Sequence, residues 1–223
     1  MDALFISQME RILWLYALPF DQDYPVLCFD ERPCFLIEEI VTGLQMKPQH
    51  PKREDYTYQK NGSCALLATI EPLTGRREAD VFARRRKREF ALHLQKVAAL
   101  YPKARKIRLV LDNLNTHNAS SFYEAFPAEE AFRLAQLFEF YYTPKKASWL
   151  NMIEIEFSTI SRLSLDRRIP TQAELEKEVL AIVKERSEQK IKIDWQFSVE
   201  KARKKLNRHY EQVNSENSKY QET

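Results

Sequence analysis

Two apolar segments of the chain each end in an aspartate. The first is Pro25-Val-Leu-Cys-Phe-Asp30 and the second is Ile107-Arg-Leu-Val-Leu-Asp112. Short apolar runs of this kind predict buried strands, and ligand sites of α/β sheets form at the carboxyl ends of strands. A carboxylate there is costly to bury unless it is paired or bound to a metal ion. Either aspartate alone could equally be a turn or helix-cap residue, but two in one chain favour a functional site.

A third acid, Glu154, lies in the segment Ser148-Trp-Leu-Asn-Met-Ile-Glu-Ile-Glu156, which predicts a helix after a loop rich in proline and lysine. Glu154 and Glu156 are two positions apart, so about 200° separates them around a helix. They cannot both face one site; Glu154 is expected beside the core face and Glu156 further around. Taken alone, Glu154 could be a solvated residue of the first helical turn. The predicted core face consists of Trp149, Ile153, Phe157 and Ile160.

Three converging carboxylates without a histidine cluster favour hard cations with oxygen ligands, Mg²⁺ or Mn²⁺. Two such ions about 3.5–4 Å apart can activate an attacking oxygen and stabilise the leaving oxygen of a phosphodiester. This chemistry needs no nucleophilic side chain, and the sequence contains neither a G-x-S-x-G elbow nor a P-loop. The acids therefore indicate metal-dependent chemistry at a phosphodiester.

The elements that must position these acids can be predicted from hydrophobic periodicity. Strands are expected at 25–30, 64–70, 77–82, 107–112 and 137–142, and helices at 1–18, 87–101, 120–126, 129–136, 150–163 and 171–188. Residues 33–58 are predicted to form a long irregular connection, followed by a turn at 60–62. Antiparallel strands followed by alternating strands and helices predict an α/β fold, a mixed five-stranded sheet with helices on both faces. We divide the chain into an N-terminal helix and linker (1–22), a main domain (23–190) and a basic C-terminal tail (191–223).

The composition predicts a globular protein, with 44% hydrophobic residues and only 3 glycines. Cys28, Cys34 and Cys64 lack paired spacing and are expected to be reduced and buried. The sequence shows no signal peptide and no run of about 18 apolar residues, so no membrane association is expected. We therefore expect a cytoplasmic protein.

Basic residues gather in several places, although the net charge is only +3. Contacts from such residues to phosphates would give affinity without sequence information, but a charge run is ordinarily a solvated surface. Lys145 and Lys146 are the exception, because their loop should border the metal ions. Trp149 could stack on a base, but a core anchor for its helix is the stronger expectation. The other basic segments are 84–88, Arg162 with Arg167 and Arg168, and 201–205 with Arg208.

Three segments resemble motifs of DDE-type transposases. Asp112-Asn-Leu-Asn-Thr-His117 resembles their Asp-Asn-x-x-x-His segment, and Phe29-Asp-Glu31 resembles their first-aspartate strand. Thr143-Pro-Lys-Lys-Ala-Ser-Trp-Leu-Asn-Met-Ile-Glu154 is similar to Pro-x-Ser-Pro-x-Leu-Asn-Pro-Ile-Glu, although Lys145-Lys146-Ala147 replaces the Ser-Pro pair and Met152 stands where proline is common. The nearest group is the mariner-related insertion-sequence transposases of bacteria. The resemblance extends from Pro25 to the 201–206 segment.

The resemblance implies that residues 23–190 form a ribonuclease H-like catalytic domain. It implies that Asp30, Asp112 and Glu154 bind two divalent ions, Mg²⁺ or Mn²⁺, for strand cleavage followed by attack of the freed 3′-hydroxyl on target DNA. The implied partners are double-stranded DNA, as element ends and target, a separate or upstream helix-turn-helix region, and a second copy of the chain on DNA. The implied location is the bacterial cytoplasm and nucleoid.

Further residues of the motifs are expected to support the metal ligands or to face DNA. For His117, a helix-cap or core role stays equally open. The expected supporting residues are Asn113, His117, Lys145, Lys146 and Asn151.

Two other functions stay open. The chain could be a non-catalytic DNA-binding or dimerising remnant of a transposase that lacks its helix-turn-helix region. It could also be a nuclease of ribonuclease H type that cuts RNA–DNA hybrids, although the Leu150-Asn-Met-Ile-Glu154 helix motif fits transposases better.

Overall fold

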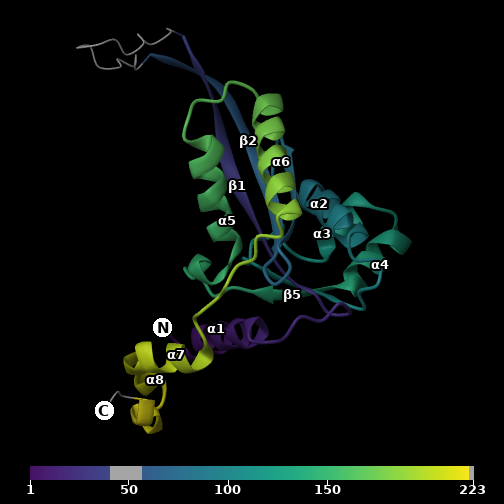
Figure 1. The fold of residues 1–223 in the computed structure, drawn as a ribbon. Coiled ribbons are helices and arrows are strands. Elements are labelled where there is room, and N and C mark those ends of the chain that lie inside the picture. Colours follow the sequence, from purple (N-terminus) through teal and green to yellow (C-terminus); the bar gives the residue numbers. More distant parts are fainter. Residues whose placement is uncertain (41–56, 221–223) are drawn as a thin grey trace, which may run out of the picture.

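The computed structural model describes residues 1–40 and 57–220 of the chain (Figure 1). The strands are β1 (Val26–Glu39), β2 (Tyr58–Glu71), β3 (Arg76–Phe82), β4 (Ile107–Leu111) and β5 (Phe138–Tyr142). The longer helices are α1 (Ala3–Tyr16), α2 (Lys87–Ala99), α4 (Ala128–Leu137), α5 (Ile153–Ile160) and α6 (Gln172–Glu188). The shorter ones are α3 (Ser120–Ala125), α7 (Val199–Lys205), α8 (Asn207–Val213), and the turns η1 (Ser148–Leu150), η2 (Ser161–Leu165) and η3 (Ser215–Tyr220).

The five strands form one mixed sheet in the order β3-β2-β1-β4-β5. β2 pairs antiparallel with both β1 and β3, whereas β4 is parallel to β1 and to β5. The antiparallel pairing of β2 with β3 follows from the short turn at 72–75. The parallel pairs require crossovers, and the helices that follow β3 and β4 supply them. The predicted order of elements and the mixed five-stranded sheet are confirmed.

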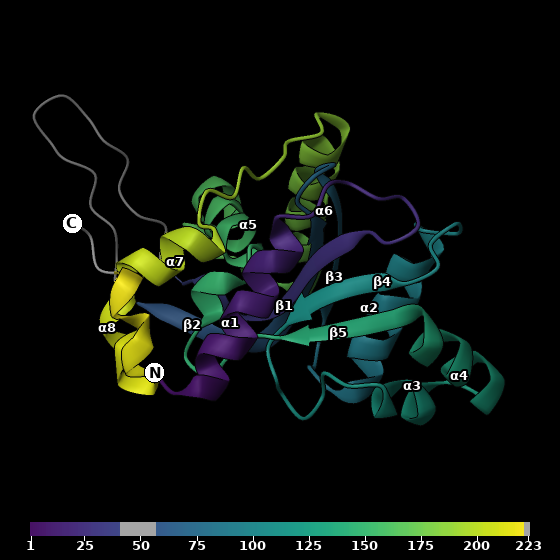
Figure 2. The same cartoon turned by 90° about the horizontal axis from the view of Figure 1, so that it is seen from below.

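Both faces of the sheet are covered by helices, as the sequence predicted (Figure 2). Successive side chains of a strand point to opposite faces, so Leu27 and Phe29 of β1 pack with α2, α3 and α4, whereas Cys28 packs with α1, α5 and α6. β4 behaves in the same way, since Leu109 lies in one core and Val110 in the other. The central strands are thus buried on both sides, which explains why they read as continuous apolar runs.

The predicted irregular connection at 33–58 is wrong at both of its ends. β1 continues to Glu39 and β2 begins at Tyr58, because the two strands pair with each other well beyond the rest of the sheet. β4 pairs only with the first residues of β1, Val26 to Cys28. Pro33 therefore lies where β1 has no hydrogen-bonded neighbour on the β4 side, and its missing N–H is tolerated there. Residues 41–56 of the predicted connection lie outside the described residues.

The turn predicted at 60–62 is a β-bulge within β2. The register shifts between Leu36 and Ile37, whose partners are Gly62 and Lys60, so Asn61 is the extra residue. Gly62 has a φ of +112°, a conformation that glycine adopts without steric cost. The Asn-Gly signal was therefore real, but it bends a strand and does not end one.

Helices from the two ends of the chain pack together. Met9 and Leu13 of α1 share a small core with Ala202 of α7 and Tyr210 of α8. Glu10 of α1 also accepts hydrogen bonds from Arg203 at 2.8 Å and from the Tyr210 hydroxyl at 2.7 Å.

The cysteine prediction is confirmed, because the three cysteines are free and buried. Within residues 1–40 and 57–220, no helix has the length and apolar character needed to cross a membrane.

Candidate active site

Two of the three predicted acids are brought side by side by the parallel pairing of β1 and β4. Cys28 stands opposite Val110 in that pair, so continuing the register by two residues places Asp30 level with Asp112. Asp112 directly follows β4, as predicted. Asp30 does not end its strand: it is the fifth of 14 residues in β1, because β1 goes on pairing with β2 after β4 has stopped.

The third acid reaches the same place through the loop after β5. The main-chain N–H of Thr143 donates to the Leu111 carbonyl at 2.9 Å, which ties the start of this loop to the end of β4. The chain then turns through η1, and Glu154 lies exposed in the first turn of α5. A cleft of about 700 Å³ collects the acids and the basic residues of the loop. Its lining includes Asp30, Glu31, Asp112, Asn113, Lys145, Lys146 and Glu154.

The cleft concentrates negative charge around Asp30. The pKa of Asp30 is raised to about 7, chiefly by burial and also by the nearby Asp112 and Glu154 carboxylates, while the main-chain N–H of Glu31 partly opposes the rise. That N–H lies 2.8 Å from Asp30 Oδ1. A carboxyl whose ionisation is opposed by burial and by neighbouring carboxylates gains most from a cation placed beside it.

The donor set of the cleft fits a hard divalent cation, because Asp30, Asp112 and Glu154 offer only carboxylate oxygens. In the described part of the chain, no three Asp, Glu, His or Cys side chains stand close enough together to hold one ion. The three acids therefore share one cleft without meeting at a single point.

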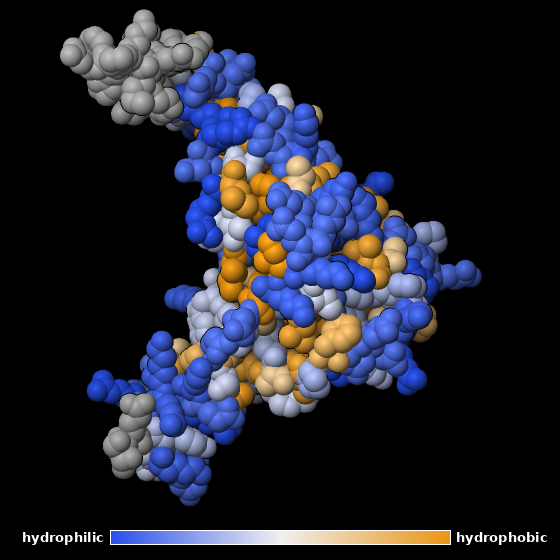
Figure 3. All heavy atoms as spheres, in the orientation of Figure 1, coloured by the Kyte–Doolittle hydropathy of each residue, from blue (hydrophilic) through white to orange (hydrophobic). Residues whose placement is uncertain are grey.

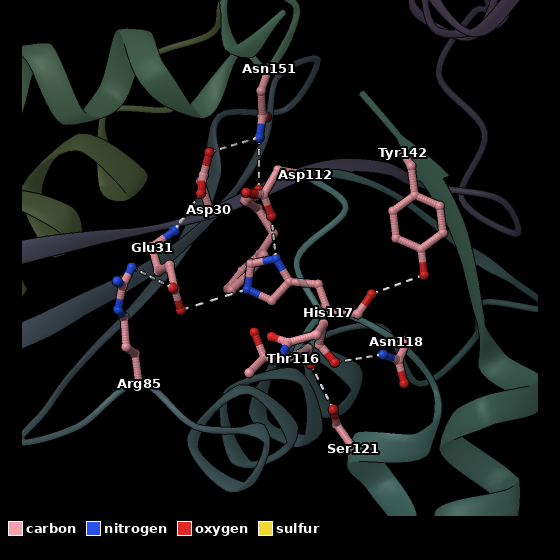
Figure 4. A network of polar contacts seen from close by, with 12 residues as sticks. Asp30, Glu31, Arg85, Asp112, Thr116, His117, Asn118, Ser121, Tyr142 and Asn151 are labelled. Atoms are coloured by element: carbon pink, nitrogen blue, oxygen red, sulfur yellow. Dashed lines mark hydrogen bonds and ion pairs between the residues drawn. The ribbon is translucent and has the colours of Figure 1, made fainter. Parts of the chain in front are cut away.

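His117 is hydrogen-bonded to the Asp112 carboxylate (Figure 4). Its ring is fully buried, with Nδ1 2.5 Å from Asp112 Oδ1 and Nε2 3.6 Å from Glu31 Oε2. Burial lowers the pKa of His117, but the Asp112 and Glu31 carboxylates outweigh it and raise the pKa to about 9. Arg85 lies 3.1 Å from the other oxygen of Glu31. His117 is thus both a core histidine, stacked on Phe90, and the partner of a predicted metal ligand.

Asn151 joins the loop before α5 to β1. The side chain is buried, and its Nδ2 donates to the Phe29 carbonyl at 2.8 Å and to Asp30 Oδ2 at 3.4 Å. The Asn151 carbonyl accepts from the Glu154 N–H at 3.1 Å. One residue therefore fixes the position of Asp30 and the start of the helix that carries Glu154.

We expect Asn151→Ala to weaken metal binding without unfolding the protein. Removing a partner that orients a metal ligand commonly lowers metal affinity or activity by about 10–100-fold. Calorimetric titration with Mn²⁺ measures the effect, and Asn61→Ala is the control because Asn61 does not line the cleft and makes its side-chain hydrogen bonds to Glu38 and to the Pro170 carbonyl. Equal Mn²⁺ affinity in the two variants would contradict the positioning role of Asn151.

The position of Glu156 differs most from the expectation. It is buried, and its carboxylate pairs with Arg77 of β3 at 2.9 Å and with Arg186 of α6 at 2.7 Å. Burial raises the pKa of Glu156, but the two guanidinium groups outweigh it and hold the pKa below its usual range. Glu156 therefore fixes the rotation of α5 that turns Glu154 towards the cleft. Sequence reasoning missed this role, because β3 reads Arg-Arg-Glu-Ala-Asp-Val-Phe and its several charges gave no local signal that singled out Arg77.

The predicted core face of the Glu154 helix is right for Ile153, Phe157 and Ile160, which are buried. It is wrong for Trp149, which is 44% exposed. α5 begins only at Ile153, so Trp149 belongs to the preceding turn η1 and does not share the helical face. Its ring meets Phe197 edge-on, with the ring centroids 5.6 Å apart.

The fold resembles solved transposase structures at low sequence identity. The chain matches the Mos1 mariner paired-end complex with Mn with a TM-score of 0.54 and 12% identity, over 100% of this chain and 65% of that one. It matches a pre-cleavage Mos1 transpososome with a TM-score of 0.53 and 14% identity, over 97% and 64%. It matches the Mos1 strand transfer complex with a TM-score of 0.53 and 15% identity, over 97% of this chain and 61% of that one. The chain thus spans 61–65% of the length of these solved chains.

A mixed five-stranded sheet of this order, covered by helices on both faces and matched by these structures, defines a ribonuclease H-like domain. No curated protein sequence matches the chain. The family described as DDE superfamily endonuclease matches residues 25–176, and the chain belongs to this family. The matched region contains Asp30, Asp112 and Glu154, and the resemblance to DDE-type transposases is confirmed.

Proposed function

We propose that this chain is the catalytic domain of a DNA transposase that cleaves DNA strands and joins them to a target, with Asp30, Asp112 and Glu154 as its metal-binding acids. The observation that carries the proposal is that the three acids line one cleft. Three carboxylates from β1, the end of β4 and α5 line one cleft in a member of the DDE endonuclease family.

The proposed cofactor is Mg²⁺ or Mn²⁺, bound as two ions by the three acids. When bound, such ions would activate an attacking oxygen and stabilise the leaving oxygen of a phosphodiester. The residues of the chain prepare the cleft: His117 holds Asp112, and Asn151 holds Asp30. Lys145 and Lys146 line the same cleft, where they can attract a DNA phosphate, and Asn113 also lines it.

The proposed substrate is double-stranded DNA, both as element end and as target. The solved Mos1 chains with this fold are in paired-end and strand transfer complexes, which supports a DNA partner here. We further propose that a helix-turn-helix region, separate or upstream, recognises the element ends. The chain would act as a homodimer on DNA, in the bacterial cytoplasm and nucleoid.

The function can be tested on supercoiled plasmid DNA with the full chain. We expect nicking with Mn²⁺ or Mg²⁺ and none with EDTA, because phosphodiester cleavage by carboxylates alone lacks the Lewis acid that this chemistry needs. Agarose gels measure the conversion of supercoiled to nicked plasmid. Binding of DNA without metal-dependent nicking would support the non-catalytic remnant. Faster cleavage of an RNA–DNA hybrid than of duplex DNA would support a nuclease of ribonuclease H type.

A further inference from the structure

A second hollow of the molecule lies on the C-terminal helices, outside the cleft that holds the acids. It is a groove of about 930 Å³ over α7 and α8, on a part of the surface that is mostly hydrophilic (Figure 3). We call it the α7–α8 groove. Its lining consists of Phe197, Lys201, Lys204, Lys205, Asn207, Arg208 and Glu211. Four cations and one carboxylate give it a clear positive charge.

The spacing of the basic residues explains how they come to share one side of the groove. Lys201, Lys204 and Lys205 follow the i, i+3, i+4 pattern that places residues on one face of α7, and Arg208 lies in α8, beyond the break at Leu206. Ala202 of α7 and Tyr210 of α8 are buried in the core shared with α1. The segment is therefore amphipathic, with its apolar face packed inside and its basic face left on the surface.

The Lys201 ammonium donates to the Gln196 carbonyl at 2.7 Å, but the other three cations of the groove lack the ion-pair partners that basic residues elsewhere in the described chain have. Arg203 pairs with Glu10 at 2.8 Å, and Arg85 pairs with Glu31 at 3.1 Å. Lys204, Lys205 and Arg208 make no ion pair with any residue in the described parts of the chain. Exposed like charges held together repel one another unless an anion neutralises them. The groove thus has the properties of an anion-binding surface.

The α7–α8 groove is joined to the active-site cleft by direct packing. Phe197 lines the groove and meets the exposed ring of Trp149 edge-on. Ala147, which precedes Trp149 by two residues, lines the cleft and also packs in the core under α7. The Tyr16 hydroxyl of α1 adds a hydrogen bond of 2.8 Å to the Leu150 carbonyl. The basic residues of the cleft and those of the groove therefore belong to segments that pack directly against each other.

We propose that the α7–α8 groove binds the phosphate backbone of duplex DNA whose scissile phosphate lies in the cleft. This inference rests on the proposed DNA substrate, and it adds a contact surface that the three acids do not require. Lysines and arginines contact phosphates without reading base sequence, so the groove supplies affinity and position.

The test is the salt dependence of DNA binding by the full chain, measured by fluorescence anisotropy with a 30-bp duplex in EDTA. Each lost phosphate contact reduces the slope of log K against log salt by about 0.9. Lys204→Gln with Lys205→Gln should therefore lower the magnitude of the slope by about 2. The matched control is Lys177→Gln with Lys184→Gln, which removes the same charge from the exposed face of α6, away from α7 and α8 (Figure 1).

The outcomes separate this inference from the proposed function, because binding in EDTA does not depend on cleavage. A reduced slope in the groove variant alone supports the inference, even if the chain never nicks DNA. Equal slopes in the groove variant and the control overturn it. The inference is also overturned if polyglutamate displaces the labelled duplex from the wild-type chain as well as unlabelled DNA does. Lysine acetylation of the wild-type chain tests the same inference without variants. Bound DNA should protect Lys204 and Lys205 from acetylation more than Lys177 and Lys184. Equal protection of the two pairs overturns the inference.

Discussion

Replacing Asp112 by asparagine is expected to reduce DNA cleavage by about 10³-fold or more. Loss of a metal ligand removes several kcal/mol of charge stabilisation from the reaction, and each 1.36 kcal/mol corresponds to about tenfold in rate. Asparagine has nearly the same shape, and its Oδ1 can still accept the hydrogen bond from His117 Nδ1. The fold around β4 should therefore be retained, so that the loss reports on chemistry.

The matched control is Asp166→Asn, because Asp166 is exposed after η2 and does not line the cleft. Plasmid nicking with Mn²⁺ measures the rate, and calorimetric Mn²⁺ titration shows whether the variant has lost metal affinity. Wild-type cleavage by Asp112→Asn would remove Asp112 from the proposed triad. Equal loss in both variants would mean that the assay measures something other than the cleft.

The sheet could be predicted from the sequence because its central strands are buried on both faces. β1 and β4 read as continuous apolar runs for this reason, and the helices between the strands show their own period. The extended hairpin could not be predicted. Residues 33–39 begin with Pro33 and end with Glu38 and Glu39, and their strand conformation comes from pairing such as that of Cys34 with Cys64. Such a contact, distant in sequence, leaves no local pattern.

The site was predictable to the extent that it depends on local motifs. Asp112, His117, Asn151 and Glu154 all lie in short segments with a recognisable order, and the cleft or its immediate support contains each of them. The partners that orient α5 were not predictable, because Arg77 and Arg186 come from distant elements. Periodicity fixed the angle between Glu154 and Glu156, but only the tertiary contacts show that Glu156 faces inwards.

Replacing Glu156 by alanine is therefore expected to cause the largest loss of stability, about 3–5 kcal/mol, because it leaves buried guanidinium charges without their partner. The Arg77 side chain is 1% exposed and that of Arg186 is 16% exposed. For a chain of this size the loss corresponds to a fall of roughly 6–20 °C in Tm. Thermal unfolding followed by circular dichroism measures it.

The matched control lies two residues away on the same helix. Glu154→Ala removes an exposed carboxylate and should change stability by no more than about 0.5 kcal/mol, while it abolishes the proposed cleavage. Equal stability losses in the two variants would contradict the separate roles that the contacts assign to these glutamates.

The pH dependence of stability provides a sharper form of the same test. The arginines hold the pKa of Glu156 below its usual range, so its contribution is present above the unfolded-state pKa and is lost as the pH falls through the folded-state pKa. Glu156→Gln should therefore be less stable than wild type at neutral pH, and the gap in unfolding free energy should narrow in acid. A gap that stays constant between neutral pH and pH 3 would show that shape, and not charge, is what Glu156 contributes. A narrowing gap would identify the ion pairs with Arg77 and Arg186 as the contacts that keep α5 turned with Glu154 towards Asp30 and Asp112.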